Sequence, residues 1–513
     1  MAKSGVGAGM SRRWRRFRRR PMGTQIGVLV VVVVVIAGAV VGIVVGTSSK
    51  SSSASQSSTA GSSSTGSFVS VNDASTSSRG VTSKTINVVF PVSNLTSLSG
   101  TLGFAGDIEF SHQTQAIDIF VNAVNQNGGI NGRKINPIIA NFDPTNETDM
   151  RSLCKQWTEG NPPVFAVVEG IGSWTGDDQL CVTQEGHTPF IGAWTTVTNW
   201  TNEGSPYLWW TGPDQADILA TLVSWGKSSG LLGNGRKVAV VVGDRASDQT
   251  ALNQYLLPFM HKAGLPTPMI QTIPAQLSES AATSAAAPLV VQRLESDGIN
   301  SVIPLVPFNA MFPYLQAETQ DNYFPKLLLS DYESSINYTL GLIPNPYLKA
   351  LNGQEGITVQ TLGGTDSPIP ESKGGYDAGV RSCYATWHAA NPNPLPGQTL
   401  INGEKPSPYI ESQGPIAGWC QQIRLFAAAA TNAGPDLNRR TFVQAMSRIQ
   451  NFPGTWTPLL TYGPDKFAGP SEYQVVQLHN NQPPSSACVL TYQHIAQGTC
   501  WHVVQSWRPL VQG

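Results

Sequence analysis

The loop Gly-Gly-Ile-Asn-Gly-Arg-Lys at residues 128–134 constrains the fold most, because it separates a helical pattern from a strand-like pattern. Before it, apolar residues recur at helical spacing over 116–124, and after it the run 135–142 is mostly apolar. Paired glycines end helices readily, since glycine adopts the left-handed conformation without a Cβ penalty. The Asn-Gly pair then favours a turn. These residues predict a helix–turn–strand connection of an α/β domain.

Strand-like and helical patterns alternate along much of the chain. Apolar runs that predict strands lie at 86–90, 137–142, 164–169, 189–192, 237–242, 269–273, 302–306 and 326–329. Helical patterns lie between several of them, at about 248–263 and at 280–296. Such alternation predicts parallel sheets with helices on both faces. A chain of 513 residues, 40% of them apolar and 13% charged, has room for two such sheets.

The N-terminal region combines a basic segment with an apolar one. Residues 1–50 hold nine arginine and lysine residues and no acid, and the stretch 25–46 carries no charge. As a helix this stretch would be about 33 Å long, which suffices to cross a bilayer. Arginines beside a spanning helix stay on the cytoplasmic side. We therefore predict a basic cytoplasmic segment at 1–24, a transmembrane anchor at 25–46 and an extracytoplasmic remainder, rather than a nucleic-acid-binding segment.

A cleavable signal peptide is the alternative interpretation of the apolar stretch. Signal peptides have a shorter apolar region of about 7–15 residues, followed by a small-residue cleavage site. No cysteine near the end of the stretch could accept a lipid, because the first one is Cys154. Residues 47–80 are mostly serine, with threonine, glycine and alanine, and therefore predict a flexible linker that holds a domain off the membrane.

The cysteine content agrees with an oxidising compartment and predicts disulfides. The six cysteines are Cys154, Cys181, Cys383, Cys420, Cys488 and Cys500. Sequence alone leaves their connectivity open, and we predict that sequential neighbours pair. None shows Cys-x-x-Cys spacing and no histidine accompanies a pair of them, so no metal site is predicted.

The loop at 128–134 also resembles the connection after the first helix in type I periplasmic solute-binding proteins of the branched-chain amino-acid-binding family. Further segments resemble that family in the same order, namely 141–144, 164–173, 186–194, 237–241, 416–434 and 438–449. The resemblance runs from about residue 85 to residue 478. It implies an α/β fold of two flavodoxin-like lobes, joined by three crossovers, with a ligand cleft between them.

The resemblance also implies how the chain divides between these lobes. Lobe 1 would comprise 81–212 and 336–455, and lobe 2 would comprise 213–335 and 456–513. The segment from Cys488 to Cys500 lies beyond the usual end of the family and is expected to be an appended hairpin. A Cys154–Cys181 bridge matches a disulfide that is often found in the first lobe of the family.

Ser173 is the leading candidate for a ligand contact. It follows the predicted strand 164–169, and ligands of open parallel sheets bind outside the carboxyl ends of the strands, where amides and helix N-termini favour an anion. In the resembled family a serine at this place hydrogen-bonds the ligand carboxylate. Residues after the fourth strand, here Trp194, Thr195 and Thr196, add contacts. The alternative is that Ser173 only caps a helix.

Aromatic residues gather at the same strand ends. Phe104, Trp174 and Trp194 either pack in the protein core or cover an apolar part of the ligand. Together they favour a cleft that accepts an apolar or ring-shaped group.

Lobe 2 departs from the family pattern. The chain has Ser247-Asp248 where many amino-acid binders have a tyrosine before a glycine. Asp331 and Glu333 either pair with a ligand ammonium group or are solvated loop acids. This departure leaves amides, short peptides and aromatic acids open as ligands.

Sequence motifs for enzymatic chemistry are incomplete. Ile171 occupies the position of the glycine that a nucleophile elbow needs before Ser173, and Thr175 that of the third glycine of a dinucleotide-binding loop. Arg236 stands where a phosphate-binding loop needs lysine. We therefore predict a binding protein that is not an enzyme and has no cofactor.

The leading hypothesis is an extracytoplasmic, membrane-anchored solute-binding protein. It would close two lobes around a small polar molecule, such as an amino acid or amide, and deliver it to an ABC permease. A ligand-sensing or interaction domain of the cell surface is the alternative, and an anchored hydrolase is a third hypothesis. Permease and ATPase genes beside the gene for this chain would favour transport.

Overall fold

The computed structural model describes residues 69–94, 110–143, 146–170, 177–193, 197–233, 235–332, 348–360, 377–390, 413–455, 457–479 and 500–513. The predicted anchor at 25–46 lies outside these residues. Within them, no helix has both the length and the apolar character that a membrane crossing requires. Two sheets with flanking helices form the described part of the chain, which agrees with the predicted α/β class.

The first sheet has five parallel strands in the order β2-β1-β3-β4-β5. The strands are β1 (Thr85–Ser93), β2 (Lys134–Phe142), β3 (Ala166–Val168), β4 (Phe190–Gly192) and β5 (Leu208–Trp210). The second half of β1 is buried at every residue, as is typical of a parallel strand covered on both faces. The sequence does not predict β5, because three residues show too little periodicity.

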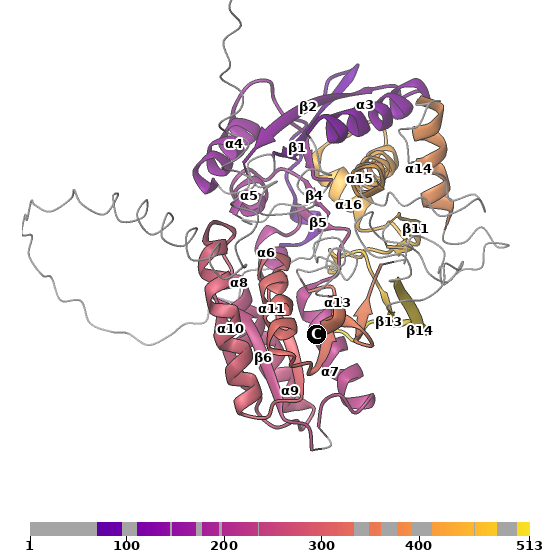
Figure 1. Cartoon of the computed structure of the whole chain (residues 1–513). Coiled ribbons are helices and arrows are strands. Elements are labelled where there is room, and N and C mark those ends of the chain that lie inside the picture. The colour runs from indigo at the N-terminus through magenta and orange to yellow at the C-terminus, as the bar shows by residue number, and fades with distance from the viewer. Residues whose placement is uncertain are drawn as a thin grey trace, which may run out of the picture. The chain divides into compact units, whose positions relative to one another are not determined.

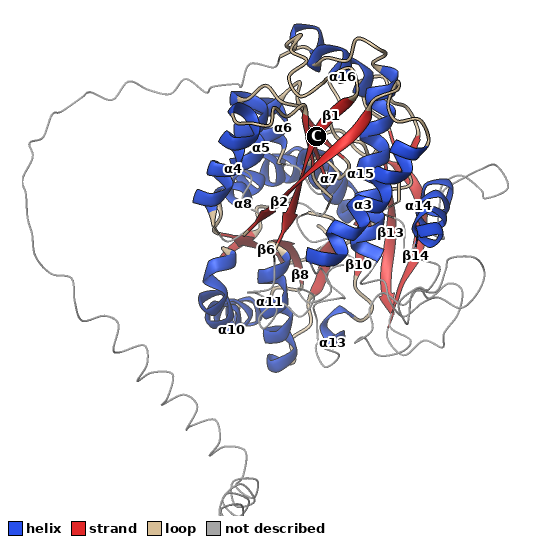
Figure 2. Ribbon diagram, turned by 90° about the horizontal axis from the view of Figure 1, so that it is seen from above, coloured by secondary structure: helices blue, strands red, loops and turns tan. Residues whose placement is uncertain are grey.

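Helices cover both faces of this sheet. They are α3 (Phe110–Gln126), α4 (Glu147–Glu159), α5 (Asp177–Leu180), the π-helical η3 (Cys181–Glu185), α6 (Thr198–Gly204), α14 (Asp377–Ala390), α15 (Gln413–Asn432) and α16 (Arg439–Met446). Figure 2 shows α3, α14 and α15 on one side of β1 and β2, with α4, α5 and α6 on the other. The side of α3 and α15 holds the larger apolar core, which includes Phe90 and Trp419 with ring centroids 5.9 Å apart. The hairpin of β11 (Phe452–Pro453) and β12 (Leu459–Leu460) adds Leu460 to this core. We name this assembly lobe 1.

The second sheet has seven strands in the order β14-β13-β10-β9-β8-β6-β7. The strands are β6 (Val238–Gly243), β7 (Met269–Ile273), β8 (Ser301–Leu305), β9 (Lys326–Leu329), β10 (Glu355–Thr358), β13 (Glu472–His479) and β14 (Cys500–Pro509). The strands from β6 to β10 pair in parallel, whereas β13 and β14 are antiparallel additions at one edge. The flanking helices are α7 (Gln215–Ser228), α8 (Ala246–Thr250), the π-helical η4 (Ala251–Leu256), α9 (Leu257–Lys262), α10 (Ser280–Ser296), α11 (Phe308–Asp321) and α13 (Leu348–Leu351).

We name this second assembly lobe 2. Figure 1 shows the elements of lobe 1 in the upper part of the view and α8 to α11 with β6 in the lower part. Apolar side chains cover both faces of the second sheet, with α10 and α11 on one face and α7, η4 and α9 on the other. The predicted spans 269–273, 326–329 and 280–296 coincide with β7, β9 and α10.

Residues 69–80 correct the predicted extent of the flexible linker. The sequence assigns them to the serine-rich linker, but Val71 and Ala74 are buried in the core of lobe 1. The Arg79 guanidinium donates hydrogen bonds to the backbone carbonyls of Trp157 and Gly160 at the end of α4. Two apolar residues and one arginine thus hold this segment against lobe 1, although its overall composition indicates a linker.

The division of the later chain between the lobes also differs from the expected one. The family resemblance implies that 336–455 belong to lobe 1, but β10 pairs with β9 and β13 in the second sheet. Conversely, residues 457–467, expected in lobe 2, contribute Leu460, Tyr462 and Phe467 to the core of lobe 1. Strand pairing and burial decide these assignments, and neither is visible in a local sequence pattern.

Disulfides are found in lobe 1. Cys154–Cys181 joins α4 to η3 with a Cα–Cα distance of 6.1 Å, and Cys383–Cys420 joins α14 to α15 at 5.8 Å. Both pairs are sequential neighbours, as predicted. Cys488 lies outside the described residues, so its pairing with Cys500 stays a prediction. The appended C-terminal strand is β14, which begins at Cys500 and pairs with β13.

Candidate functional site

Each parallel sheet has one point at which the order of strands reverses. In lobe 1 the chain runs from β1 outward to β2 and then returns to β3 on the other side, so the carboxyl ends of β1 and β3 flank the reversal. In lobe 2 the same reversal lies between β6 and β8. Open α/β sheets bind ligands in the crevice outside the strand ends at such a point. The topology therefore defines one candidate crevice in each lobe.

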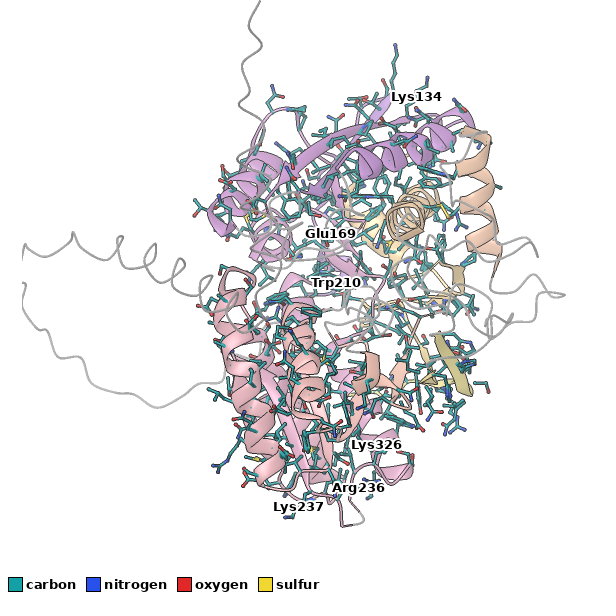
Figure 3. The ribbon with its side chains drawn as sticks, in the orientation of Figure 1. Lys134, Glu169, Trp210, Arg236, Lys237 and Lys326 are labelled. Carbon is teal, nitrogen blue, oxygen red and sulfur yellow. A yellow bond between two sulfur atoms is a disulfide. The ribbon has the colours of Figure 1, made fainter. Side chains whose placement is uncertain are left out.

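The labelled residues of Figure 3 show how these strand ends are oriented. Lys134, at the amino end of β2, lies at the top of the view, and Lys237 and Lys326, at the amino ends of β6 and β9, lie at the bottom. Glu169, directly after β3, and Trp210, at the carboxyl end of β5, lie between them. The carboxyl ends of the strands in lobe 1 are therefore directed toward the middle of this view.

All of the predicted ligand contacts in lobe 1 fall outside the described residues. These are Phe104, Ser173, Trp174, Trp194, Thr195 and Thr196, together with Glu333 of lobe 2. The described residues that lead into them are on neighbouring strands, because β3 pairs with β4 through Val168 and Ile191. Gly170 and Ala193, the last described residues before 171–176 and 194–196, thus follow neighbouring strands at the same edge of the sheet.

The helix α15 contacts the described residues that precede both segments, a role that no local sequence pattern predicted. A Cβ atom added to Gly170 would lie 2.2 Å from the Trp419 ring, so the absence of a side chain there lets the tryptophan pack against the end of β3. The buried Gln422 side chain donates hydrogen bonds to the Gly192 carbonyl (3.3 Å) and to the Thr211 hydroxyl (2.7 Å). Trp419 and Gln422 are three positions apart on the same helix. This spacing places two side chains on one helix face, so the sequence could have indicated that they act together.

Asp331 lies within the described residues, and its carboxyl group hydrogen-bonds to residues of the second sheet. It is 1% exposed, and its Oδ2 atom accepts hydrogen bonds from the Thr358 hydroxyl (2.8 Å) and the Val359 amide (2.7 Å). These bonds tie the carboxyl end of β9 to that of β10. Ser247, in the first turn of α8, is half-buried at the carboxyl end of β6. Ligand contact by either residue stays a prediction.

Asp248 is the more deeply buried acid of lobe 2, with no exposed surface. The Arg245 guanidinium donates to both of its oxygens at 2.7 and 2.8 Å, and the Tyr332 hydroxyl donates at 2.7 Å. A Cβ atom on Gly243 would lie 2.0 Å from the carboxylate, so glycine at the end of β6 makes room for it. This cluster joins the end of β6 to the residues after β9 and orders the lobe 2 crevice.

The first crossover between the lobes carries a half-buried acid. Asp214 caps α7 and accepts hydrogen bonds from the Ala216 amide (2.8 Å) and the Thr198 hydroxyl (2.6 Å). Burial raises its pKa from the ordinary 3.8 to about 6, against the opposing effect of these hydrogen bonds. Beside it, the Tyr255 hydroxyl of lobe 2 donates to the Asn199 side-chain oxygen of lobe 1 at 2.5 Å. The acid thus lies at a polar contact between the lobes.

A lysine binds several backbone carbonyls of the segment 461–470, which connects β12 of lobe 1 to β13 of lobe 2. The Lys466 ammonium group donates to the carbonyls of Thr461 (2.6 Å), Gly469 (3.1 Å) and Pro470 (2.9 Å), and to that of Ala468. Burial lowers its pKa to about 8, while the nearby Asp217 and Asp214 act in the opposite direction. The described residues contain no cluster of three or more His, Cys, Asp or Glu side chains that could hold a metal ion.

Comparison with known proteins identifies the family. The model of a family described as periplasmic binding protein matches residues 91–340, which include all of β3 to β9 and both strand-order reversals. The chain belongs to the type I periplasmic binding proteins. This family consists of binding proteins and not enzymes, as the sequence analysis predicted. No curated protein matches the sequence significantly.

Solved structures share the fold of this periplasmic binding protein at low sequence identity. A fatty acid ABC transporter substrate-binding protein from Thermomonospora curvata is 16% identical, with a TM-score of 0.57 over 84% of this chain and 93% of that one. A solute-binding protein of an ABC transporter from Rhodopseudomonas palustris BisB5, in complex with 3,4-dihydroxy benzoic acid, is 15% identical, with a TM-score of 0.57 over 83% and 98%. A branched chain amino acid ABC transporter protein from Thermus thermophilus with bound valine is 12% identical, with a TM-score of 0.54 over 83% and 96%.

Proposed function

We propose that this periplasmic binding protein captures a small polar solute between its lobes and delivers it to an ABC-type permease. The observation that carries the proposal is the pair of parallel sheets, each with a strand-order reversal at its carboxyl edge, in a chain that matches the family model. Solved proteins of this fold are described as ABC transporter components. A membrane anchor at 25–46 and a linker from 47 to about 68 would keep the lobes outside the membrane and near such a permease.

The proposed ligand carries a carboxylate or carbonyl group. The structures of similar fold contain valine in one case and an aromatic acid in another, so both kinds of acid enter the screen. In the proposal, Ser173, Thr195 and Thr196 hydrogen-bond the acidic group, and Phe104, Trp174 and Trp194 cover the apolar part. Ser247, Asp331 and Glu333 are the proposed contacts from lobe 2. The helix α15 would hold the lobe 1 segments in place through Trp419 and Gln422.

A thermal-shift screen of the full chain in detergent tests this proposal. Amino acids, amides, short peptides and aromatic acids would each be added at millimolar concentration. A ligand that binds the folded chain at 100 times its dissociation constant should stabilise it by about 2.7 kcal/mol, which raises the melting temperature by several degrees. No shift with any of these solutes would contradict the proposal of a solute-capture protein.

Ser173→Ala tests the assignment of the lobe 1 contact. Loss of a hydrogen bond to a charged ligand group should weaken binding of the solute found in the screen by about ten- to a hundredfold. If Ser173 only caps a helix, the variant should lose about 1 kcal/mol of stability and keep its affinity. Calorimetric titration and chemical denaturation of the same preparation distinguish the two results. Unchanged affinity would remove Ser173 from the proposed site.

A further inference from the structure

Polar side chains of the helix α6 in lobe 1 contact lobe 2. This helix begins at Thr198, directly after the segment 194–196 that contains proposed ligand contacts. Its partner in lobe 2 is the π-helical η4, which continues α8 after the carboxyl end of β6. Figure 1 shows α6 at the lower border of lobe 1 and α8 at the upper border of lobe 2. Both elements therefore follow the carboxyl ends of strands, on the sides at which the lobes meet.

Hydrogen bonds join the first turn of α6 to η4. The Tyr255 hydroxyl donates to the side-chain oxygen of Asn199 at 2.5 Å, and the Asn199 side-chain nitrogen donates to that of Gln254, through its oxygen, at 3.2 Å. Asn199 thus uses both ends of its amide group on two consecutive residues of lobe 2. Asn199 and Tyr255 are half-buried, which strengthens such bonds relative to an open surface.

The neighbouring Thr198 joins the same turn of α6 to α7. Its hydroxyl group donates to the Asp214 carboxylate at 2.6 Å and accepts from the Ala216 amide at 2.9 Å. Asp214 is the N-cap of α7, so a residue of lobe 1 takes part in capping a helix of lobe 2. Two consecutive residues of α6 therefore contact two separate elements of lobe 2.

The π-helical form of η4 supports a functional role for this contact. A π-helix is uncommon, and its single turns occur frequently at functional sites. The apolar residues of η4 are buried in the core of lobe 2, whereas Gln254 is exposed and Tyr255 is half-buried. The turn thus packs its apolar side chains into its own lobe and presents polar ones to α6.

We propose that Thr198, Asn199 and Tyr255 form a latch that holds the lobes in the arrangement in which the solute contacts both of them. The inference rests on the proposed function, because that function places ligand contacts at 194–196, directly before the latch. A solute that contacts both lobes binds an arrangement in which they are close, so bonds that favour this arrangement raise the affinity. The three latch residues are positioning residues and do not contact the solute.

Distances between the lobes test the latch without a ligand. Spin labels would be attached to non-natural ketone side chains in place of Asp118 on α3 and Gln292 on α10, which are exposed residues of different lobes. The cysteines stay unlabelled. Pulsed electron resonance on the full chain in detergent then gives the distribution of label distances. In Tyr255→Phe the loss of one hydrogen bond should raise the ratio of separated to close lobes about two- to twelvefold. Asn199→Ala, which loses two bonds, should raise it further.

Tyr323→Phe is the matched control. It removes a hydroxyl group that donates to the Ile299 carbonyl at 2.5 Å within lobe 2, so it should leave the distance distribution unchanged. An unchanged distribution in both Tyr255→Phe and Asn199→Ala would overturn the latch. A change in Tyr323→Phe as large as that in Tyr255→Phe would overturn it as well. Circular dichroism and the melting temperature would verify that each variant folds.

Solute binding tests the link between the latch and the proposed site. Valine and 3,4-dihydroxybenzoate are the probes, and calorimetric titration measures their affinity. Tyr255→Phe should weaken binding about two- to twelvefold, mainly through faster release, and Tyr323→Phe should keep the wild-type affinity. Altered label distances with unchanged affinity would overturn the role of the latch in solute binding. If neither probe binds the wild type, that result counts against the proposed solute class, and the label distances still decide the latch.

Discussion

The two lobes share an architecture but are held together differently. Lobe 1 contains the disulfides Cys154–Cys181 and Cys383–Cys420, each of which joins two helical elements beside its five-stranded sheet. Among the described residues lobe 2 has no disulfide, and it is held by a larger seven-stranded sheet and by the buried Arg245–Asp248–Tyr332 cluster. A disulfide acts mainly on the unfolded chain, whereas a buried ion pair acts in the folded state. The two lobes should therefore respond to different perturbations.

The largest effect is expected from Asp248→Ala. It breaks a mostly buried ion pair between Asp248 and Arg245, which should lower the free energy of unfolding by about 3–5 kcal/mol. Asp297→Ala is the matched control. Asp297, the C-cap of α10, forms an ion pair with Arg293 in the last turn of that helix, and both side chains are more than a third exposed. The control should cost less than about 1 kcal/mol.

Hydrogen exchange would localise this effect. Amides of β6 and β9 should exchange faster in Asp248→Ala, while those of β1 and β2 keep their protection. Equal costs for the buried and the exposed aspartate, or loss of protection in lobe 1 first, would contradict the claim that the cluster stabilises lobe 2.

Removing either disulfide of lobe 1 should have the next largest effect, as for Cys154–Cys181. The bridge closes a loop of 27 residues, for which loss of chain entropy in the unfolded state gives about 3.5 kcal/mol. The Cys154→Ala/Cys181→Ala variant should therefore unfold at lower denaturant concentration, with faster exchange of β1 and β3 amides. Removing Cys383–Cys420, which closes 37 residues, should cost slightly more. Destabilisation confined to β6 and β8 would show that the comparison of the lobes is wrong.

The smallest of the three effects concerns Asp214, at the crossover between the lobes. Its pKa is raised to about 6, so the folded chain keeps a proton that the unfolded chain releases near the ordinary value of 3.8. The free energy of unfolding should therefore fall as the pH rises from about 4 to about 6. Above about pH 6, Asp214 should cause no further change. Because the residue is only half-buried, we expect a contribution of about 2 kcal/mol.

Asp214→Asn should remove this dependence and keep the helix cap, since asparagine caps as well as aspartate. Denaturation midpoints measured from pH 4 to pH 7 for wild type, Asp214→Asn and the exposed-site control Asp436→Asn would check it. If the wild type and Asp214→Asn show parallel pH profiles of stability, the pKa of Asp214 is not raised in the folded chain.

Sequence periodicity predicted the regular elements of lobe 2 well. The bounds of β7, β9 and α10 agree with the predicted spans, because each has a continuous apolar or alanine-rich pattern between turn residues. It did not predict β5, whose three residues pair with β4 only in the folded sheet. Residues 69–80 were assigned to the linker because serine dominates the composition, although Val71 and Ala74 are buried.

The candidate site was predictable only in part. That Ser173 and Trp194 follow strand carboxyl ends could be inferred from the order of apolar runs. The supports of the site could not, because Gln422 contacts Gly192 across 230 residues of sequence. For the same reason the sequence left Asp331 open as a ligand contact or a solvated loop acid, whereas in the fold its carboxylate accepts hydrogen bonds from Thr358 and Val359.

The sequence by itself determined the α/β class, the alternation that produces parallel sheets and the resemblance to solute-binding proteins. These follow from periodicity and from the spacing of residues near one another along the chain. The tertiary structure alone decided which lobe holds β10, where Asp248 finds its counter-charge, and that α15 supports two segments far from it in sequence. Such features depend on contacts between distant residues, whose free energy comes from burial and hydrogen bonding in the folded state and leaves no local pattern.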